Sequence, residues 1–83
     1  MGVRQERREA RTRELLDAAM ELLVAEGLKG LTIGALAQQV DAAVGAIYRY
    51  FPSKTALLVA LQLRAIEELR REVEAALARV DGA

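Results

Sequence analysis

The chain contains no cysteine and no histidine among its 83 residues. Without cysteine it has no disulfide framework, no zinc-finger spacing and no thiol nucleophile. The absence of histidine removes the usual general base and the commonest metal ligand. The sequence also has no glycine-rich phosphate loop and no carboxylate pair in a plausible pocket, so it offers no catalytic constellation. We therefore expect neither an enzyme nor a bound cofactor or metal.

Long apolar runs are missing as well. No stretch of about 18 consecutive apolar residues occurs, so no transmembrane helix is expected. The amino terminus is basic, but Asp17 and Glu21 interrupt the apolar stretch from Leu15 to Val24, which makes it a poor signal peptide. We expect a soluble, cytoplasmic protein.

Aromatic residues make up only 4% of the chain, whereas Leu and Ala dominate and β-branched residues are scarce. Leu and Ala favour helices. A chain of 83 residues suffices for one small domain and not for two. The composition therefore predicts a single all-α domain.

Charge is balanced in total but not along the chain. Lys plus Arg and Asp plus Glu number 12 each, yet residues 1–13 hold five arginines against two glutamates, a local charge of +3. Residues 44–54 hold Arg49 and Lys54 and no acid, while four arginines meet five acids from residue 55 onward. Positive charge at these two places suits a polyanion. The amino-terminal arginines are equally compatible with a minor-groove or phosphate arm and with a solubilising tail.

The first half of the chain predicts two helices. The first runs from about Arg4 to Glu26, and Gly27 stands where a helix stop is expected. Thr32 is then the predicted N-cap of a second helix of about two turns. Its apolar residues follow the i, i+3, i+4, i+7 spacing of a buried stripe: Ile33, Leu36, Ala37 and Val40.

The second half predicts two more helices. A short one runs from roughly Val44 to Tyr50 and is ended by Pro52, which lacks an N–H. Ser53 then caps a helix over residues 54–80, about 40 Å long at 1.5 Å per residue and too long to be buried at its far end. Val59, Ile66, Val73 and Val80 recur on it every seven residues, a weak coiled-coil-like seam. The predicted fold is a three-helix bundle with a homeodomain-like helix-turn-helix, plus a long fourth connecting helix.

Residues 32–51 have the layout of a helix-turn-helix, in which the first helix braces a second that enters the major groove. The outward side of the second helix carries groups suited to DNA, Gly45, Ala46, Tyr48 and Arg49, with Tyr50 at its flank. The next helix starts with two more, Ser53 and Lys54. Gly45 allows close backbone approach, while the tyrosines and Arg49 suit phosphates or base edges. Ser53 and Lys54 lie where backbone N–H groups favour an anion. The tyrosines could instead be half-buried packing residues.

Four ordered segments carry a family pattern: TRELLDAAMELLVAEG at 12–27, LTIGALAQQV at 31–40, GAIYRYFPSK at 45–54 and ALL at 56–58. Together they resemble the DNA-binding domain of TetR-family (tetracycline-repressor-like) transcriptional regulators. The likeness covers about residues 9–69. It implies a sequence-specific regulator, most often a repressor, that binds a palindromic operator as a dimer through recognition helix 44–50.

The resemblance also assigns roles to individual residues. It implies phosphate or base contacts for Thr32, Tyr48, Tyr50 and Lys54, and Gly45 matches the Gly near the start of the recognition helix. It implies that Val44, Ala46 and Arg49 set sequence specificity. Ile47 and Phe51 match core positions. Two positions depart from the family pattern. Asp41 stands in the turn where Gly is frequent, and Asp tolerates a left-handed backbone. Ala43 stands where Ser or Thr usually caps the recognition helix, at a cost of about 1 kcal/mol, unless Asp41 serves as the cap.

TetR-family regulators normally carry a larger carboxy-terminal domain that dimerises and binds a small-molecule inducer. The resemblance thus implies that residues 70–83 continue the connecting helix toward such a domain and that the chain is a fragment. The rival hypothesis is a helical protein–protein interaction or dimerisation module that uses the apolar face of helix 54–80. The salt dependence of binding distinguishes the two hypotheses, because phosphate binding weakens steeply with ionic strength and binding through an apolar interface does not.

Overall fold

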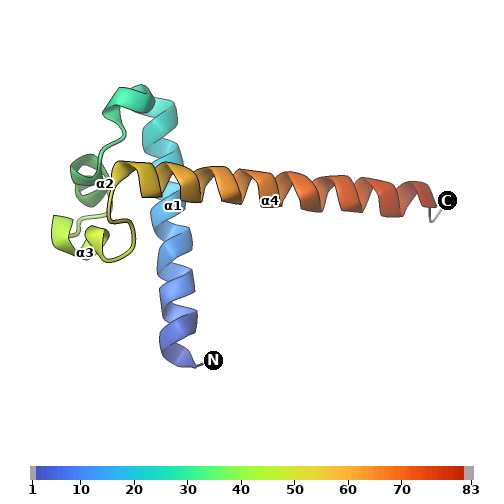
Figure 1. Ribbon diagram of the computed structural model, residues 1–83, viewed down its shortest axis with the longest axis horizontal. Helices are drawn as coiled ribbons and strands as arrows, with labels where there is room; N and C mark the ends of the chain where they lie inside the picture. The colour runs from blue at the N-terminus through green and yellow to red at the C-terminus, as the bar shows by residue number, and fades with distance from the viewer. Residues whose placement is uncertain (1, 82–83) are drawn as a thin grey trace.

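The computed structural model describes residues 2–81 and contains four helices: α1 (Val3–Gly30), α2 (Ile33–Gln39), α3 (Val44–Tyr48) and α4 (Lys54–Asp81). No strand occurs in this range. The first three helices gather at one end of the molecule, and α4 leaves them as a long arm (Figure 1). This confirms the predicted all-α fold with a fourth connecting helix. Of the segment predicted at 70–83, residues 82–83 lie outside the described range.

Helix α1 is longer at both ends than the sequence predicted. Gly27 does interrupt it, with φ 77° and ψ 179°, a conformation that glycine adopts without steric cost. One further helical turn follows, and Leu31 N–H donates to the Leu28 carbonyl at 3.3 Å. Leu31 is fully buried, so the extra turn delivers an anchoring side chain to the core. The spacing of nearby residues did not predict this turn, because the turn depends on the packing of Leu31 in the core.

The core is entirely apolar, with no buried polar or charged residue in the described range. All four helices contribute to it, mostly through the positions that helical spacing predicted. Its members are Leu15, Leu16, Ala18, Ala19, Leu22, Leu31, Ile33, Leu36, Ala37, Ile47, Phe51, Leu57 and Leu61. Helix α1 packs on both α2 and α4, and α2 packs on α3. Because α2 and α3 share this core, their relative orientation is set by side-chain packing.

Helix α4 is anchored only by its first turns. Leu57 and Leu61 are buried, whereas every residue after Glu67 in the described range is exposed up to Val80. Arg64 adds an ion pair to Asp17 of α1 and a second one to Glu68 at 3.2 Å. As predicted, the far end of the helix is not buried, and its seven-residue seam is exposed. Within residues 2–81 no helix is both long and apolar enough to cross a membrane.

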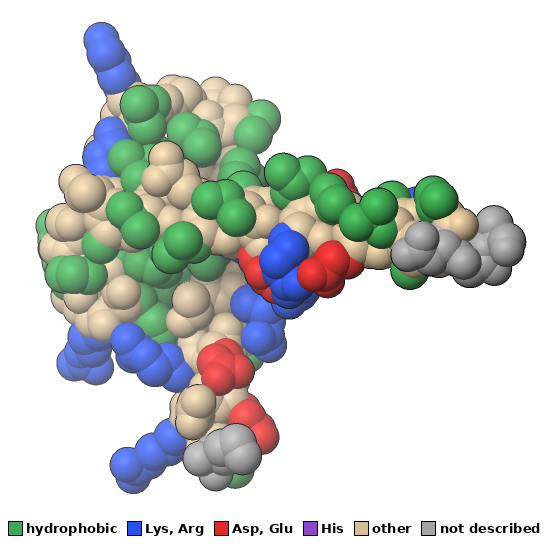
Figure 2. Space-filling model, turned by 45° about the vertical axis from the view of Figure 1, so that its right-hand side comes forward, with side chains coloured by type: hydrophobic (Ala, Val, Ile, Leu, Met, Phe, Trp, Pro, Cys, Tyr) green, Lys and Arg blue, Asp and Glu red, His purple; other side chains and the backbone are tan. Residues whose placement is uncertain are grey.

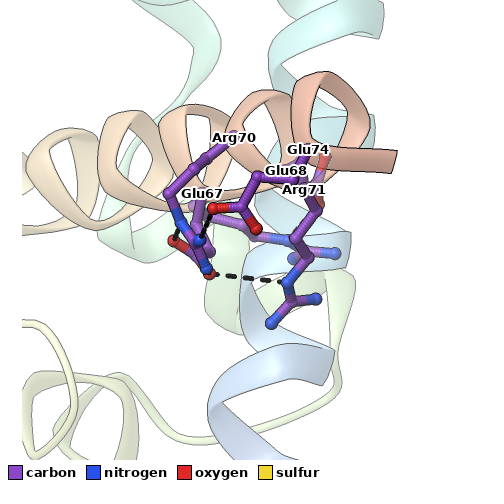
Figure 3. Close-up of polar contacts among 6 residues, drawn as sticks. Glu67, Glu68, Arg70, Arg71 and Glu74 are labelled. Carbon is purple, nitrogen blue, oxygen red and sulfur yellow. Dashed lines mark hydrogen bonds and ion pairs between the residues drawn. The ribbon is translucent and has the colours of Figure 1, made fainter. Parts of the chain in front are cut away.

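Ion pairs between successive turns support the exposed part of α4. Arg70 bridges Glu67 and Glu74 at 2.5 Å each, and Arg71 lies 3.5 Å from Glu67 (Figure 3). The hydrogen bonds from Arg70 lower the pKa of Glu67 below its ordinary value. Pairs at i, i+3 and i, i+4 favour the helix locally and are screened by salt. They allow α4 to stay helical where no core covers it.

Burial along α4 predicts how its leucines respond to truncation. Leu57→Ala removes a side chain that is 0% exposed, whereas Leu63→Ala truncates one that is 62% exposed. We expect the first to lower the free energy of unfolding by about 2–5 kcal/mol and the second to change it by less than about 0.5 kcal/mol. Urea unfolding followed by circular dichroism measures both. Equal losses would contradict the boundary of the core within α4.

Candidate nucleic-acid interface

Helix α3 turns one side into the core and the other outward. Ile47 is 1% exposed and Phe51, just after the helix, is 5% exposed. Val44 and Tyr48, which lie one turn apart on this helix, are 44% and 47% exposed. Their spacing places both on one outward strip of the helix. The expectation that Ile47 and Phe51 belong to the core is confirmed.

The remaining positions on α3 complete this outward surface. Gly45 and Arg49 are exposed and Ala46 is half-buried. A Cβ added at Gly45 would meet no atom within 4 Å, so the backbone at this position is open on its outer side. The outward surface of α3 is thus formed by small or flexible groups around one tyrosine ring. Such a surface lets the helix backbone come close to a partner.

The turn between α2 and α3 has the geometry that its sequence predicted. Asp41 has φ 53°, the only non-glycine residue with positive φ among those described. Its N–H donates to the Gln38 carbonyl at 3.2 Å, and Ala42 N–H donates to the Ala37 carbonyl at 2.9 Å. Aspartate tolerates this left-handed conformation better than most residues do. The turn therefore closes without glycine.

The start of α3 lacks a side-chain cap. Ala43 is the N-cap residue, and no side chain accepts a hydrogen bond from the free N–H groups of the first turn. The alternative that Asp41 caps an earlier start is wrong, because the helix begins at Val44. The predicted end at Tyr50 is also wrong, since α3 ends at Tyr48. Tyr50 and Phe51 both donate backbone N–H groups to the Ile47 carbonyl at 2.9 Å, a tight turn that directs Phe51 into the core.

Three predicted site residues also serve the fold. The hydroxyl of Thr32 accepts from Ala35 N–H at 2.9 Å, and that of Ser53 accepts from Ala56 N–H at 3.1 Å, so both predicted N-caps are confirmed. The Lys54 ammonium donates to the Leu28 carbonyl at 2.7 Å, near the end of α1, where a cation is favoured. Each hydroxyl keeps its own hydrogen free to donate.

Tyr50 is held by a residue that the sequence analysis did not single out. Its half-buried ring lies 4.5 Å from the Arg8 guanidinium carbon and 6.5 Å from the Phe51 ring centre. Arg8 also donates to the Arg49 carbonyl at 3.1 Å. Arg8 and Arg49 are 41 positions apart, so no local pattern could have indicated this contact. Tyr50 thus lies at the flank of α3, the position expected for it, with Arg8 against its ring.

The described side chains form no metal site. Within residues 2–81 no cluster of three or more His, Cys, Asp or Glu residues could hold a metal ion. The acidic residues Glu67 and Glu74 are instead paired with Arg70. The candidate site is the outward surface of α3, with Val44, Gly45, Tyr48 and Arg49 exposed.

A short helix presented outward by a bracing helix defines the class of helix-turn-helix DNA-binding transcriptional regulators. Residues 15–61 match the family described as bacterial regulatory proteins, tetR family. The chain belongs to this family. The resemblance found from its segments is thereby confirmed.

Curated relatives carry regulator names. The chain is 41% identical over 59 residues to the HTH-type transcriptional repressor KstR of Rhodococcus jostii, covering 71% of this chain and 28% of the relative. It is 38% identical over 66 residues to the KstR of Mycolicibacterium smegmatis, covering 80% and 32%. An HTH-type transcriptional regulator of Xanthobacter autotrophicus, from the dhlA 5′ region, is 44% identical over 52 residues, covering 63% and 26%. The chain thus spans less than a third of the length of these relatives, and no solved structure matches it.

Restoring a cap on α3 should stabilise the domain. Ala43→Ser places a hydroxyl where it can accept from the N–H of Gly45 or Ala46, and we expect a gain of about 0.5–1 kcal/mol in the free energy of unfolding. Ser53→Ala is the matched loss at α4 and should cost a similar amount. Thermal or urea unfolding of both variants measures the effect. An unchanged or lowered stability in Ala43→Ser would show that the start of α3 does not accept a cap.

Proposed function

We propose that this chain is the DNA-binding part of a transcriptional repressor that places α3 in the major groove of a palindromic operator. The observation that carries the proposal is the division of α3 into a core side, with Ile47, and an outward strip, with Val44 and Tyr48 about half exposed. A helix fixed on one side by a core and open on the other has the geometry for base contact.

The outward residues divide into those that position the protein and those that read sequence. The Tyr48 hydroxyl suits a phosphate, and its ring suits a thymine methyl. Val44, Ala46 and Arg49 are the proposed specificity positions, since apolar groups contact thymine methyls and Arg binds guanine. At Gly45 the backbone is open, since a Cβ built there meets no atom within 4 Å, and this suits a close approach to DNA. Tyr50 flanks the helix and contributes its hydroxyl from the edge of the surface.

Thr32, Ser53 and Lys54 are proposed phosphate contacts at the start of α2 and α4. Their capping bonds fix the helix starts, whose free N–H groups favour an anion. The Lys54 ammonium has three hydrogens and donates one of them to Leu28. It can therefore hold the end of α1 and a phosphate at the same time.

Repression by this domain is proposed to require a dimer in the cytoplasm. A palindromic operator needs two recognition helices about 34–36 Å apart, one helical turn of DNA. The relatives are more than three times as long as the part that this chain matches. In our proposal a further domain, reached through α4, dimerises and binds a small-molecule inducer, whose binding changes the spacing of the two α3 helices.

A second candidate function rests on α4. Leu63, Ile66 and Leu69 are each more than half exposed, which leaves an apolar strip available to a protein partner. An interaction module of this kind needs no DNA contact by α3. Its binding would persist at high salt, unlike phosphate binding.

Removing the proposed phosphate contacts should weaken DNA binding at every sequence. For Tyr48→Ala or Lys54→Ala we expect a lower affinity and, for Lys54→Ala, a slope of log K against log salt smaller by about 1. Fluorescence anisotropy over a salt series measures both. Arg79→Ala, at the far end of α4, is the charge control. An unchanged slope in Lys54→Ala would remove Lys54 from the phosphate contacts.

Arg49 should influence which sequence is bound. Selection from random DNA with wild-type protein, in the longest available form, should return a palindrome, and Arg49→Ala should alter the selected bases at a cost of about 1–3 kcal/mol for the original site. The same site from both proteins would show that Arg49 is not a base reader. Recovery of no palindrome from the wild type would favour the interaction module.

A further inference from the structure

The first turns of α1 carry charged side chains that lie outside the core. Residues 3–9 are all exposed, and this segment precedes the family match, which begins at residue 15. Arginines near a helix amino terminus oppose the helix dipole, so local helix stability does not account for them. The arginines at this position therefore serve either solubility or the binding of a partner.

The charged residues at the start of α1 fall on two different sides of the helix. At 3.6 residues per turn, Arg4, Arg7, Arg8 and Arg11 fall within an arc of about 100°. Glu6 and Glu9 lie outside this arc, on the other side of the helix together with Arg13. A solubilising tail needs no such separation, whereas a face that meets phosphates does.

Arg8 joins this arginine face to the recognition helix. It stacks on the Tyr50 ring at 4.5 Å and donates to the Arg49 carbonyl at 3.1 Å. The other side-chain hydrogen bond from residues 3–9, Gln5 to Glu9, stays within α1. Arg8 therefore fixes the first turns of α1 against the carboxy-terminal end of α3.

The two elements consequently lie on the same side of the molecule. The amino-terminal half of α1 runs past α3 and ends beyond it, and both lie on one side of α4 (Figure 1). In the space-filling view several Lys and Arg side chains lie at this lower end, as others do at the top and along α4 (Figure 2). Among the arginines of the arc, Arg11 is neutralised by Glu14 at 2.9 Å, whereas Arg4 and Arg7 have no hydrogen bond or ion pair to another described residue.

We propose that Arg4 and Arg7 form a second phosphate-binding surface, which contacts the backbone of the duplex bound by α3. Arg8 is its positioning residue, because its contacts with Tyr50 and Arg49 align the surface with the recognition helix. The inference rests on the proposed function, since it needs α3 on DNA. It extends the DNA contact of this protein to residues before position 15, where the match to the family begins.

The first experiment counts phosphate contacts. The 83-residue chain and its variants are titrated with a mixed-sequence duplex of about 30 base pairs, three turns of DNA, over a series of salt concentrations. Arg4→Ala and Arg7→Ala should each reduce the slope of log K against log salt by about 1. Arg13→Ala removes the same charge from the opposite side of α1 and should leave the slope unchanged.

The second experiment isolates the positioning role without changing charge. Tyr50→Leu removes the ring on which Arg8 stacks, and the slope should fall by about 2 as Arg4 and Arg7 lose their alignment. Tyr50→Phe keeps the ring and removes only an uncharged hydroxyl, so its affinity can fall but its slope should stay that of the wild type. In an Arg8→Ala background, Arg4→Ala should have no further effect. Circular dichroism establishes that each variant is folded; if Tyr50→Leu is not, the Arg8→Ala background decides the positioning role.

The outcomes separate this inference from the proposed function. If the wild-type chain shows no salt-dependent affinity for the duplex, the proposed function fails. If the wild type binds and Arg4→Ala and Arg7→Ala behave like Arg13→Ala, the second surface is overturned while α3 keeps its role. If Arg4→Ala still lowers the slope in the Arg8→Ala background, Arg8 does not position the surface.

Discussion

The presentation of α3 depends on one constraint, the burial of Ile47 and Phe51 in the core shared by α1, α2 and α4. A five-residue helix does not persist in water by itself, because too few hydrogen bonds follow its nucleation. Helix α3 exists in this position because Ile47 is packed and because the turn after Tyr48 directs Phe51 inward. The same packing decides which side of α3 remains outside. The proposed binding surface and part of the core thus belong to one short helix.

The residues at the edges of this surface work for the fold as well as for the proposed DNA contact. Thr32 and Ser53 cap helices, Lys54 holds the end of α1, and Tyr50 receives Arg8. A capping hydroxyl or a bonded ammonium is preorganised, so little conformational freedom is lost when a phosphate arrives. This dual use ties the geometry of the interface to the integrity of the bundle.

Helices α1 and α4 extend beyond the core. Each exposes a surface there, which is charged on α1 and partly apolar on α4. The amino-terminal half of α1 displays arginines on one side, while the outer part of α4 displays apolar side chains between its ion pairs. The bundle buries only the middle of α1 and the start of α4. The first surface lies beside α3, and the second extends away from it, as expected if DNA and protein partners occupy opposite ends of the domain.

The sequence by itself determined the helices, their N-caps at Thr32 and Ser53, the left-handed turn at Asp41 and the missing cap at Ala43. These features depend on periodicity, capping and backbone preference within a few neighbouring residues. Only the tertiary structure decided the early end of α3, the burial of Leu31, the bond from Lys54 to Leu28 and the contact of Arg8 with Tyr50. Those contacts join residues far apart in the chain, and they exist only once the crossing of the helices has brought the side chains together.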